Sequence, residues 1–231
     1  MTEQPFDPRR HLPPAIAQRV ALHLTADDLK GPDDPYHYGE SPDDVQKRRD
    51  AAAASKSRLW LARVPSRFAS ASLSELNAAQ DEGGKVSGWW ERGGANLVLR
   101  SIEPGVGKTH AAYAIGNHAV STGAWAQAWT MSDFNEAIRP GRDDTAFTVA
   151  QECDLLVLDD LGREQRSEWT LERLQGVLDA RWSNEKRTVF TTNLPGDQFQ
   201  KHYGEPIVDR ITDGVTMVTV AGTSRRKPAP W

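Results

Sequence analysis

The segment Asn96-Leu-Val-Leu-Arg-Ser-Ile-Glu-Pro-Gly-Val-Gly-Lys-Thr-His-Ala-Ala-Tyr-Ala114 decides how this chain folds. Its apolar run predicts a short buried strand. The prolyl-glycyl segment that follows predicts a tight turn, and Lys108 marks the start of a predicted helix. A strand, a glycine turn and a helix N-terminus form a cradle for phosphate, because backbone N–H groups and the positive end of the helix face the anion. The segment therefore predicts a phosphate-binding loop in an α/β domain.

The residues of this loop have distinct expected tasks. Lys108 reaches the β- and γ-phosphates, and the Thr109 hydroxyl ligates Mg²⁺. The usual pattern, G-x-x-x-x-G-K-[ST], has its first glycine where this chain has Ile102. Because Gly105 and Gly107 are retained, we expect Ile102 to alter loop geometry and affinity rather than the identity of the site. The alternative is a surface turn that reads Gly-Val-Gly-Lys-Thr by chance.

The composition describes a polar globular protein. Of its 231 residues, 26% are charged and 38% hydrophobic, and the formal net charge is −4. No apolar run approaches the length of a membrane span, and the first residues lack the apolar segment of a signal peptide. The single cysteine, Cys153, excludes an internal disulfide and a cysteine zinc cluster. We therefore expect a cytoplasmic protein with no membrane partner, in which DNA contact depends on a local basic patch.

A second informative segment is Asp154-Leu-Leu-Val-Leu-Asp-Asp160. A continuous apolar run that ends in acidic residues is typical of a central parallel strand, since helices cover both faces of such a strand. At its carboxyl end, Asp159 can hold Mg²⁺ through water and Asp160 can polarise an attacking water. The alternative is a buried strand whose acidic residues only begin a turn. The phosphate loop about fifty residues earlier disfavours that alternative.

Further elements follow from local patterns. Residues 187–193 predict a strand that ends at Asn193, whose neutral amide can orient water beside the γ-phosphate; an ordinary turn asparagine is the alternative. Other expected elements are a strand over 124–131, a helix capped at Ser132-Asp133, a helix over 168–184 and a last strand over 215–220.

The N-terminal region carries none of this chemistry. A helix is predicted over Pro14–Leu24 and a longer one from Ser41 to about Ala62, which Ser41 can cap. Apolar residues recur every seven positions along the second helix, beside a basic stripe: Val45, Ala52 and Leu59; Arg49, Lys56 and Arg63. The stripe either meets a partner protein or DNA, or is a solvated face packed on its own domain. We place a domain boundary near Arg63, which gives a helical partner-binding region over 1–62 and an ATPase domain over 63–231.

Together these motifs resemble the DnaC/IstB group of AAA+ ATPases, which comprises bacterial and phage helicase loaders and their transposition relatives. The resemblance covers roughly Ala62 to Arg226, and its most specific segments are Pro104–His110, Asp154–Gly162 and Thr191–Leu194. It implies the three-layer α/β fold of an AAA+ P-loop NTPase, with about five parallel strands preceded by a small helical N-terminal region.

The resemblance also implies roles for individual residues. Nucleotide binding would use the loop and a sensor-like arginine: Pro104, Gly105, Val106, Gly107, Lys108, Thr109 and His110, with Arg226. Thr109 and Asp159 would hold the metal. Catalysis would use Lys108, Asp160, Asn193 as sensor 1 and Arg210 as an arginine finger on the ATP of a neighbouring subunit. An aspartate at 160, where most AAA+ proteins have glutamate, predicts modest hydrolysis because its reach is shorter.

The implied function is that of an ATP- and Mg²⁺-dependent loader. Such a protein delivers a hexameric replicative DNA helicase onto single-stranded DNA during replication initiation and forms homo-oligomers on nucleotide or DNA. Two other functions remain open. One is an IstB-like transposition helper, which shares the ATPase core, and the other is a nucleotide-gated binding module with little hydrolysis.

Overall fold

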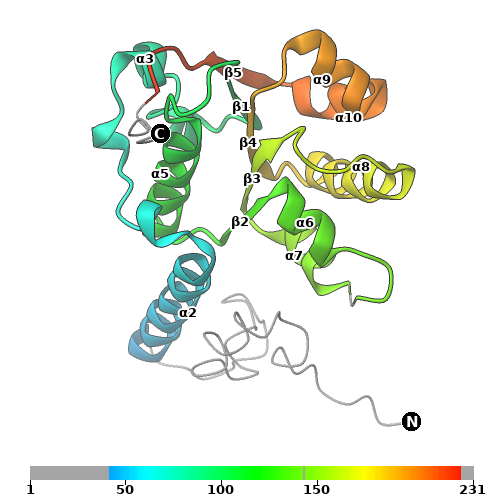
Figure 1. Cartoon of the computed structure of the whole chain (residues 1–231). Coiled ribbons are helices and arrows are strands. Elements are labelled where there is room, and N and C mark those ends of the chain that lie inside the picture. The colour runs from blue at the N-terminus through cyan, green and yellow to red at the C-terminus, as the bar shows by residue number, and fades with distance from the viewer. Residues whose placement is uncertain (1–41, 143, 225–231) are drawn as a thin grey trace, which may run out of the picture.

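The computed structural model of the chain describes residues 42–142 and 144–224, and a parallel five-stranded sheet runs through the middle of this part (Figure 1). The strand order is β2-β3-β4-β1-β5, and every neighbouring pair is parallel. The strands are β1 (Asn96–Arg100), β2 (Ala126–Thr130), β3 (Leu155–Leu161), β4 (Arg187–Thr192) and β5 (Val215–Thr219). The predicted parallel sheet of about five strands is therefore confirmed.

Helices cover both faces of the sheet, which gives three layers (Figure 1). On one face lie α2 (Pro42–Arg63), α3 (Ala78–Asp81) and α5 (Lys108–Ser121). The other face carries α6 (Met131–Ala137), α7 (Thr145–Glu152), α8 (Glu168–Ser183), α9 (Gly196–Tyr203) and α10 (Glu205–Thr212). The remaining helices are short: η3 (Ser66–Phe68), η4 (Leu73–Glu75), η5 (Glu82–Gly84) and α4 (Trp89–Arg92).

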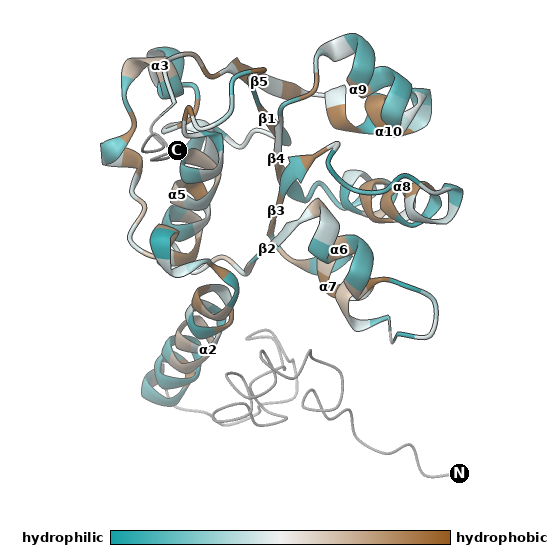
Figure 2. Ribbon diagram, viewed as in Figure 1, coloured by the Kyte–Doolittle hydropathy of each residue, from teal (hydrophilic) through white to brown (hydrophobic). Residues whose placement is uncertain are grey.

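The alternation of side chains along β1 explains why both layers form. Leu97 and Leu99 point into the core beneath α5, whereas Val98 points into the core beneath the other layer. All three side chains are buried, as expected for a central strand of a parallel sheet. In Figure 2 the hydrophobic residues accordingly follow the strands and the sheet-facing sides of the helices.

The C-terminal half of α2 belongs to the same core as the P-loop domain. Trp60 is 1% exposed, and its Nε1 donates a hydrogen bond of 2.7 Å to Asn117 Oδ1 on α5. Asn117 in turn donates to the carbonyls of Phe68 and Ala71, which fixes the segment after α2. Packing therefore continues across the boundary that the sequence places near Arg63.

Two members of the basic stripe contact their own domain. Lys56 Nζ donates to the Gly123 carbonyl at 3.2 Å, and the Arg63 guanidinium lies 4.2 Å from the ring centroid of Trp129. Burial lowers the pKa of Arg63 to about 10. Arg49, nearer the start of α2, is exposed. The stripe is thus partly a packed face, and only its outer end is open to solvent.

Some local predictions need correction. The N-cap of α6 is Thr130 rather than Ser132, because the Thr130 hydroxyl accepts from the Asp133 N–H at 3.1 Å. Helix α7 lies where no helix is predicted above, since its eight residues have no side-chain cap to mark its start. The helix predicted over Pro14–Leu24 lies outside the described residues.

The contact between α2 and α5 predicts the effect of one substitution. A Cβ at Gly116 would lie 2.1 Å from Trp60 Cζ2, so Gly116→Ala must displace the indole. Helical Gly→Ala changes usually stabilise by about 0.5–1 kcal/mol, but overpacking costs about 1–3 kcal/mol. We expect Gly116→Ala to lower the free energy of unfolding by about 1–2 kcal/mol in urea titrations.

Gly176→Ala in α8 is the matched control. Its Cβ would meet Phe147 Cζ at 3.4 Å, an ordinary contact, so the free energy of unfolding should stay the same or rise. Equal shifts for the two variants would contradict the tight packing of α2.

Candidate functional site

A cavity of about 560 Å³ opens at the carboxyl ends of the strands. Its wall combines the loop before α5, the ends of β3 and β4, and η3; the lining residues are Arg67, Phe68, Pro104, Gly105, Gly107, Lys108, Thr109, His110, Asp159, Asp160, Arg163, Thr191 and Asn193. The volume lies in the range of about 300–1,000 Å³ that small-molecule sites usually occupy. The carboxyl edge of a parallel sheet is also where ligands usually bind.

The loop between β1 and α5 is built for an anion. Gly107 has a φ of +104°, which favours glycine, and it occupies the N-cap position of α5. A Cβ there would also meet Gln80 Nε2 at 2.0 Å, so the backbone approaches α3 closely. Because glycine has no side chain with which to cap the helix, the first N–H groups of α5 are left to a ligand.

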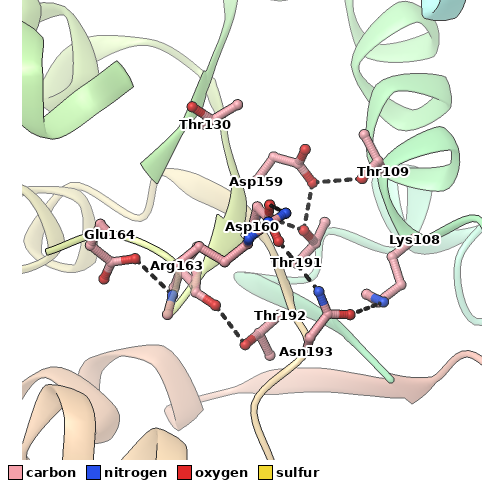
Figure 3. A network of polar contacts seen from close by, with 12 residues as sticks. Lys108, Thr109, Thr130, Asp159, Asp160, Arg163, Glu164, Thr191, Thr192 and Asn193 are labelled. Carbon is pink, nitrogen blue, oxygen red and sulfur yellow. Dashed lines mark hydrogen bonds and ion pairs between the residues drawn. The ribbon is translucent and has the colours of Figure 1, made fainter. Parts of the chain in front are cut away.

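Lys108 is buried at 7% exposure and points into the cavity. Its Nζ donates to Asn193 Oδ1 at 2.6 Å (Figure 3). It also donates to the carbonyls of Ser101 and Glu103 at 3.4 and 3.3 Å. These three acceptors are neutral oxygens. A phosphate would supply the stronger partner.

Next to Lys108 in the sequence, Thr109 forms a hydrogen bond with the Asp159 carboxylate. Thr109 Oγ1 donates to Asp159 Oδ1 at 3.0 Å, and Thr191 Oγ1 donates to the same oxygen at 2.5 Å. Burial raises the pKa of Asp159, and the two hydrogen bonds oppose that rise. A hydroxyl beside a carboxylate suits Mg²⁺, which prefers oxygen and is usually bound by one or two carboxylates together with phosphates. Among the described residues no cluster of three or more His, Cys, Asp or Glu side chains could hold a metal alone.

Asp160 has an unusual backbone conformation. Its φ is +64°, and the pairing of β3 with β4 shifts register between Leu158 and Leu161. The shift turns the carboxylate to the cavity, where Oδ2 pairs with Arg163 at 2.9 Å and Oδ1 lies 3.4 Å from Asn193 Nδ2 (Figure 3). Strained conformations of this kind persist where the surrounding structure holds them and often coincide with functional sites.

A continuous chain of polar contacts results. Arg163, Asp160, Asn193 and Lys108 contact each other in that order, although they come from three separate segments (Figure 3). A ligand that draws Lys108 away from Asn193 would therefore also change the surroundings of Asp160.

Phe68 gives the cavity an aromatic lining residue. Phe68 stacks on Tyr113 with ring centroids 5.0 Å apart, and the Arg67 guanidinium lies 4.6 Å from the Phe68 ring. The motif analysis assigned no role to Phe68, Arg67 or Arg163. The one available signal was the segment Val64–Phe68, which breaks the helix before the P-loop domain.

The other predicted site residues lie as follows. His110 Nε2 is 3.2 Å from Glu75 Oε2, and Val106 is buried in the core. Ile102 is 71% exposed, so the loop accommodates it by turning it to solvent. Arg226 lies outside the described residues.

Arg210 lies at the other end of the sheet. Its carbonyl accepts from Asn96 Nδ2 at 2.8 Å, and Asn96 begins β1, whereas the P-loop follows the end of β1. Its guanidinium pairs with Asp179 at 2.7 Å and lies 4.6 Å from the Trp182 ring centroid. Arg210 therefore lines a different hollow, of about 590 Å³, and can act on a nucleotide only in another molecule.

The arrangement fits a magnesium nucleotide. The helix N-terminus and Lys108 suit its phosphates, Thr109 and Asp159 suit its metal, and the stacked Phe68 suits an aromatic base. Asp160 and Asn193 lie where a water could be oriented. None of the described helices is long and apolar enough to cross a lipid bilayer.

Comparisons with known proteins agree with this geometry. The chain is 34% identical over 119 residues to the uncharacterized protein YdaV of Escherichia coli (strain K12), a match that covers 48% of this chain and 47% of YdaV. It is 28% identical over 120 residues to the replicative helicase loader DnaC of the same organism, a match that covers 49% of each chain. The matched part thus spans about half the length of these curated relatives.

Solved structures share the fold. The crystal structure of the DnaC helicase loader matches with a TM-score of 0.60 and 24% identity, covering 68% of this chain and 100% of that one. The crystal structure of DnaI matches with a TM-score of 0.61 and 24% identity, covering 71% of this chain and 94% of that one. The resemblance to DnaC/IstB-like AAA+ ATPases is confirmed. The sequence profile of the IstB-like ATP binding protein family matches residues 85–229, and because this is more than half of the chain, the protein belongs to that family.

Proposed function

We propose that this protein is an ATP-dependent helicase loader, which delivers a hexameric replicative DNA helicase onto single-stranded DNA in the cytoplasm. The observation that carries the proposal is the cavity in which Lys108, the Thr109–Asp159 pair and the Asp160–Asn193 pair converge. Family membership supports ATPase activity in general, and the similarity to replicative helicase loaders supports the choice of partner.

Each side chain then has a task in phosphoryl transfer. When bound, Mg-ATP supplies the transferable phosphoryl group and the charge that stabilises its transfer. Lys108 binds the phosphates, and Thr109 and Asp159 hold the metal. Asp160 accepts a hydrogen bond from the attacking water, and Asn193 orients that water. The nearby guanidinium of Arg163 keeps the carboxylate of Asp160 directed into the cavity.

The first prediction of this scheme concerns binding and turnover. Lys108→Ala removes a buried cation and should weaken Mg-ATP binding by about 2 kcal/mol or more, which is roughly 30-fold in Kd. Asp160→Ala should retain binding and lose turnover. Calorimetry and phosphate release measure the two effects, with Lys201→Ala on the exposed face of α9 as the control. Equal ATP affinity in wild type and Lys108→Ala would refute the site.

The second prediction concerns Arg210. Its ion pair with Asp179 and its stacking on Trp182 hold the guanidinium at a surface remote from the nucleotide cavity of the same chain. We propose that it completes the site of a neighbouring subunit, where an arginine finger can raise phosphoryl transfer by several orders of magnitude. Mixtures of Arg210→Ala with Lys108→Ala should then hydrolyse ATP faster than the summed rates of the separate variants. Strict additivity under conditions where oligomers form would reduce Arg210 to an ion-pair residue.

The third prediction concerns the partner. We assign helicase binding to residues 1–62, but Ser55 and Trp60 are buried in the ATPase core. The deletion therefore removes residues 1–41 only, and Arg49→Glu alters the exposed outer part of α2. Both variants should lose binding to a hexameric replicative helicase in co-elution experiments while ATP affinity stays unchanged. Lys201→Glu is the matched charge reversal, and normal helicase binding by both variants would show that the partner site lies elsewhere.

DNA preference separates the loader from its alternatives. For a loader, ATP should raise affinity for single-stranded over duplex DNA in a salt-sensitive way. A preference for duplex DNA without binding to any helicase would favour a transposition helper, an alternative that the family description supports. Tight ATP binding without hydrolysis would favour a nucleotide-gated module, for which the exposed Ile102 in the loop is the motivating observation.

A further inference from the structure

A buried carboxylate lies just beyond the residues assigned to the reaction. The side chain of Glu164 is only 4% exposed, although both of its neighbours in the loop between β3 and α8 are exposed. Ionised carboxylates are costly to bury unless hydrogen bonds replace water. No lysine or arginine in the described part of the chain forms an ion pair with Glu164. The reaction scheme above does not use this residue.

Two donors and a histidine nitrogen surround the carboxylate. Oε2 accepts from the Gly162 N–H at 2.8 Å, while Oε1 accepts from the Tyr203 hydroxyl at 2.5 Å and lies 3.1 Å from His202 Nε2. Burial, together with the negative charge of Glu164, raises the pKa of Tyr203, so its hydroxyl remains a donor. Glu164 thus joins its own loop to the C-terminal end of α9.

The contact with Gly162 completes a set of three hydrogen bonds that hold the backbone after Asp159. The Asp160 N–H donates to Thr191 Oγ1, the Leu161 carbonyl accepts from Thr192 Oγ1, and the Gly162 N–H donates to Glu164. Two of the three come from β4 and one comes from Glu164. The peptide unit that precedes Asp160 and the one that follows Leu161 are therefore each held by side chains.

The loop after β3 packs closely against the segment that follows β4. Gly162 has a φ of +93°, and a Cβ there would lie 2.3 Å from Leu194 Cδ1. Leu194 follows Asn193 directly and precedes α9, whose far end holds Glu164 through Tyr203. The segments that carry Asp160 and Asn193 therefore lie side by side (Figure 3). Both are also joined to α9, one through Tyr203 and the other by chain continuity.

We propose that Glu164 is a positioning residue of the ATPase site, which fixes the backbone of Asp160 and Arg163 relative to Asn193 by joining the loop after β3 to α9. The proposal rests on the hydrolytic function proposed above. Glu164 touches no reacting group, so its effect must appear in turnover and loop order rather than in nucleotide affinity.

The test substitution is Glu164→Gln. A glutamine has a single acceptor oxygen, so it cannot accept from the Gly162 N–H and the Tyr203 hydroxyl on separate oxygens as the carboxylate does. We expect kcat for ATP hydrolysis to fall about tenfold or more, since bonds to buried charged groups are among the strongest, while the KM and Kd for Mg-ATP stay unchanged. Tyr203→Phe removes one donor only and should lower kcat less, which keeps the test valid if Glu164→Gln folds poorly.

A second readout does not depend on activity. In nucleotide-free full-length protein, hydrogen–deuterium exchange of the Gly162 amide should be slow in wild type and fast in Glu164→Gln. Glu168→Gln, an exposed position four residues further along, is the control and should match wild type in both measurements.

The outcomes separate the two proposals. Wild-type kcat and slow exchange in Glu164→Gln would overturn the positioning role, as would a fall in kcat matched by an equal rise in the Kd for ATP. If wild type itself binds ATP without hydrolysing it, the hydrolytic function fails. The exchange experiment then still decides whether Glu164 holds the loop.

Discussion

The position of β4 between β1 and β3 is the constraint on which this site depends. The P-loop follows β1 and the two aspartates end β3, so the last residues of β4 lie between them. Thr191 holds the end of β3, because its hydroxyl donates to Asp159 and accepts from the Asp160 N–H. Asn193, just beyond, bridges Lys108 and Asp160. A sheet in which β4 did not lie between β1 and β3 would separate these groups.

Buried charged side chains lie at both edges of the sheet, the carboxyl edge and the amino edge. At the carboxyl edge of the sheet these are Lys108, Asp159 and Glu164, each held by several hydrogen bonds. At the amino edge it is Arg181, which is 1% exposed and donates to Thr188 and to the carbonyls of Ala150, Cys153 and Arg187. Burying such groups is favourable only when their hydrogen bonds are satisfied, so they fix one arrangement of the surrounding segments.

Helix α2 is the first described element of the chain and leads into the ATPase core. Its last turns are anchored by Trp60 beneath Asn117, whereas its first turns are largely exposed (Figure 2). Because Asn117 lies on the helix that begins at Lys108, the anchor and the phosphate loop share one rigid element. Packing therefore connects α2, whose outer part is proposed above as the partner site, to the helix that starts the nucleotide site.

By itself, the sequence determined the strand–loop–helix around Lys108, the buried strand ending at Asp159 and the sheet class, because glycine placement, apolar runs and helix periodicity are local properties. It also placed Asn193 at the end of a strand. Only the tertiary structure brought Arg163 to Asp160 in the shared cavity, Phe68 to the lining of that cavity and Glu164 to Tyr203. It also decided that α2 packs across the predicted boundary. Arg163 and Asp160 are only three residues apart, and their contact depends on the register shift in β3. The other contacts join segments that are distant along the chain and depend on strand order and on the packing of α9. None of these features has a local signature.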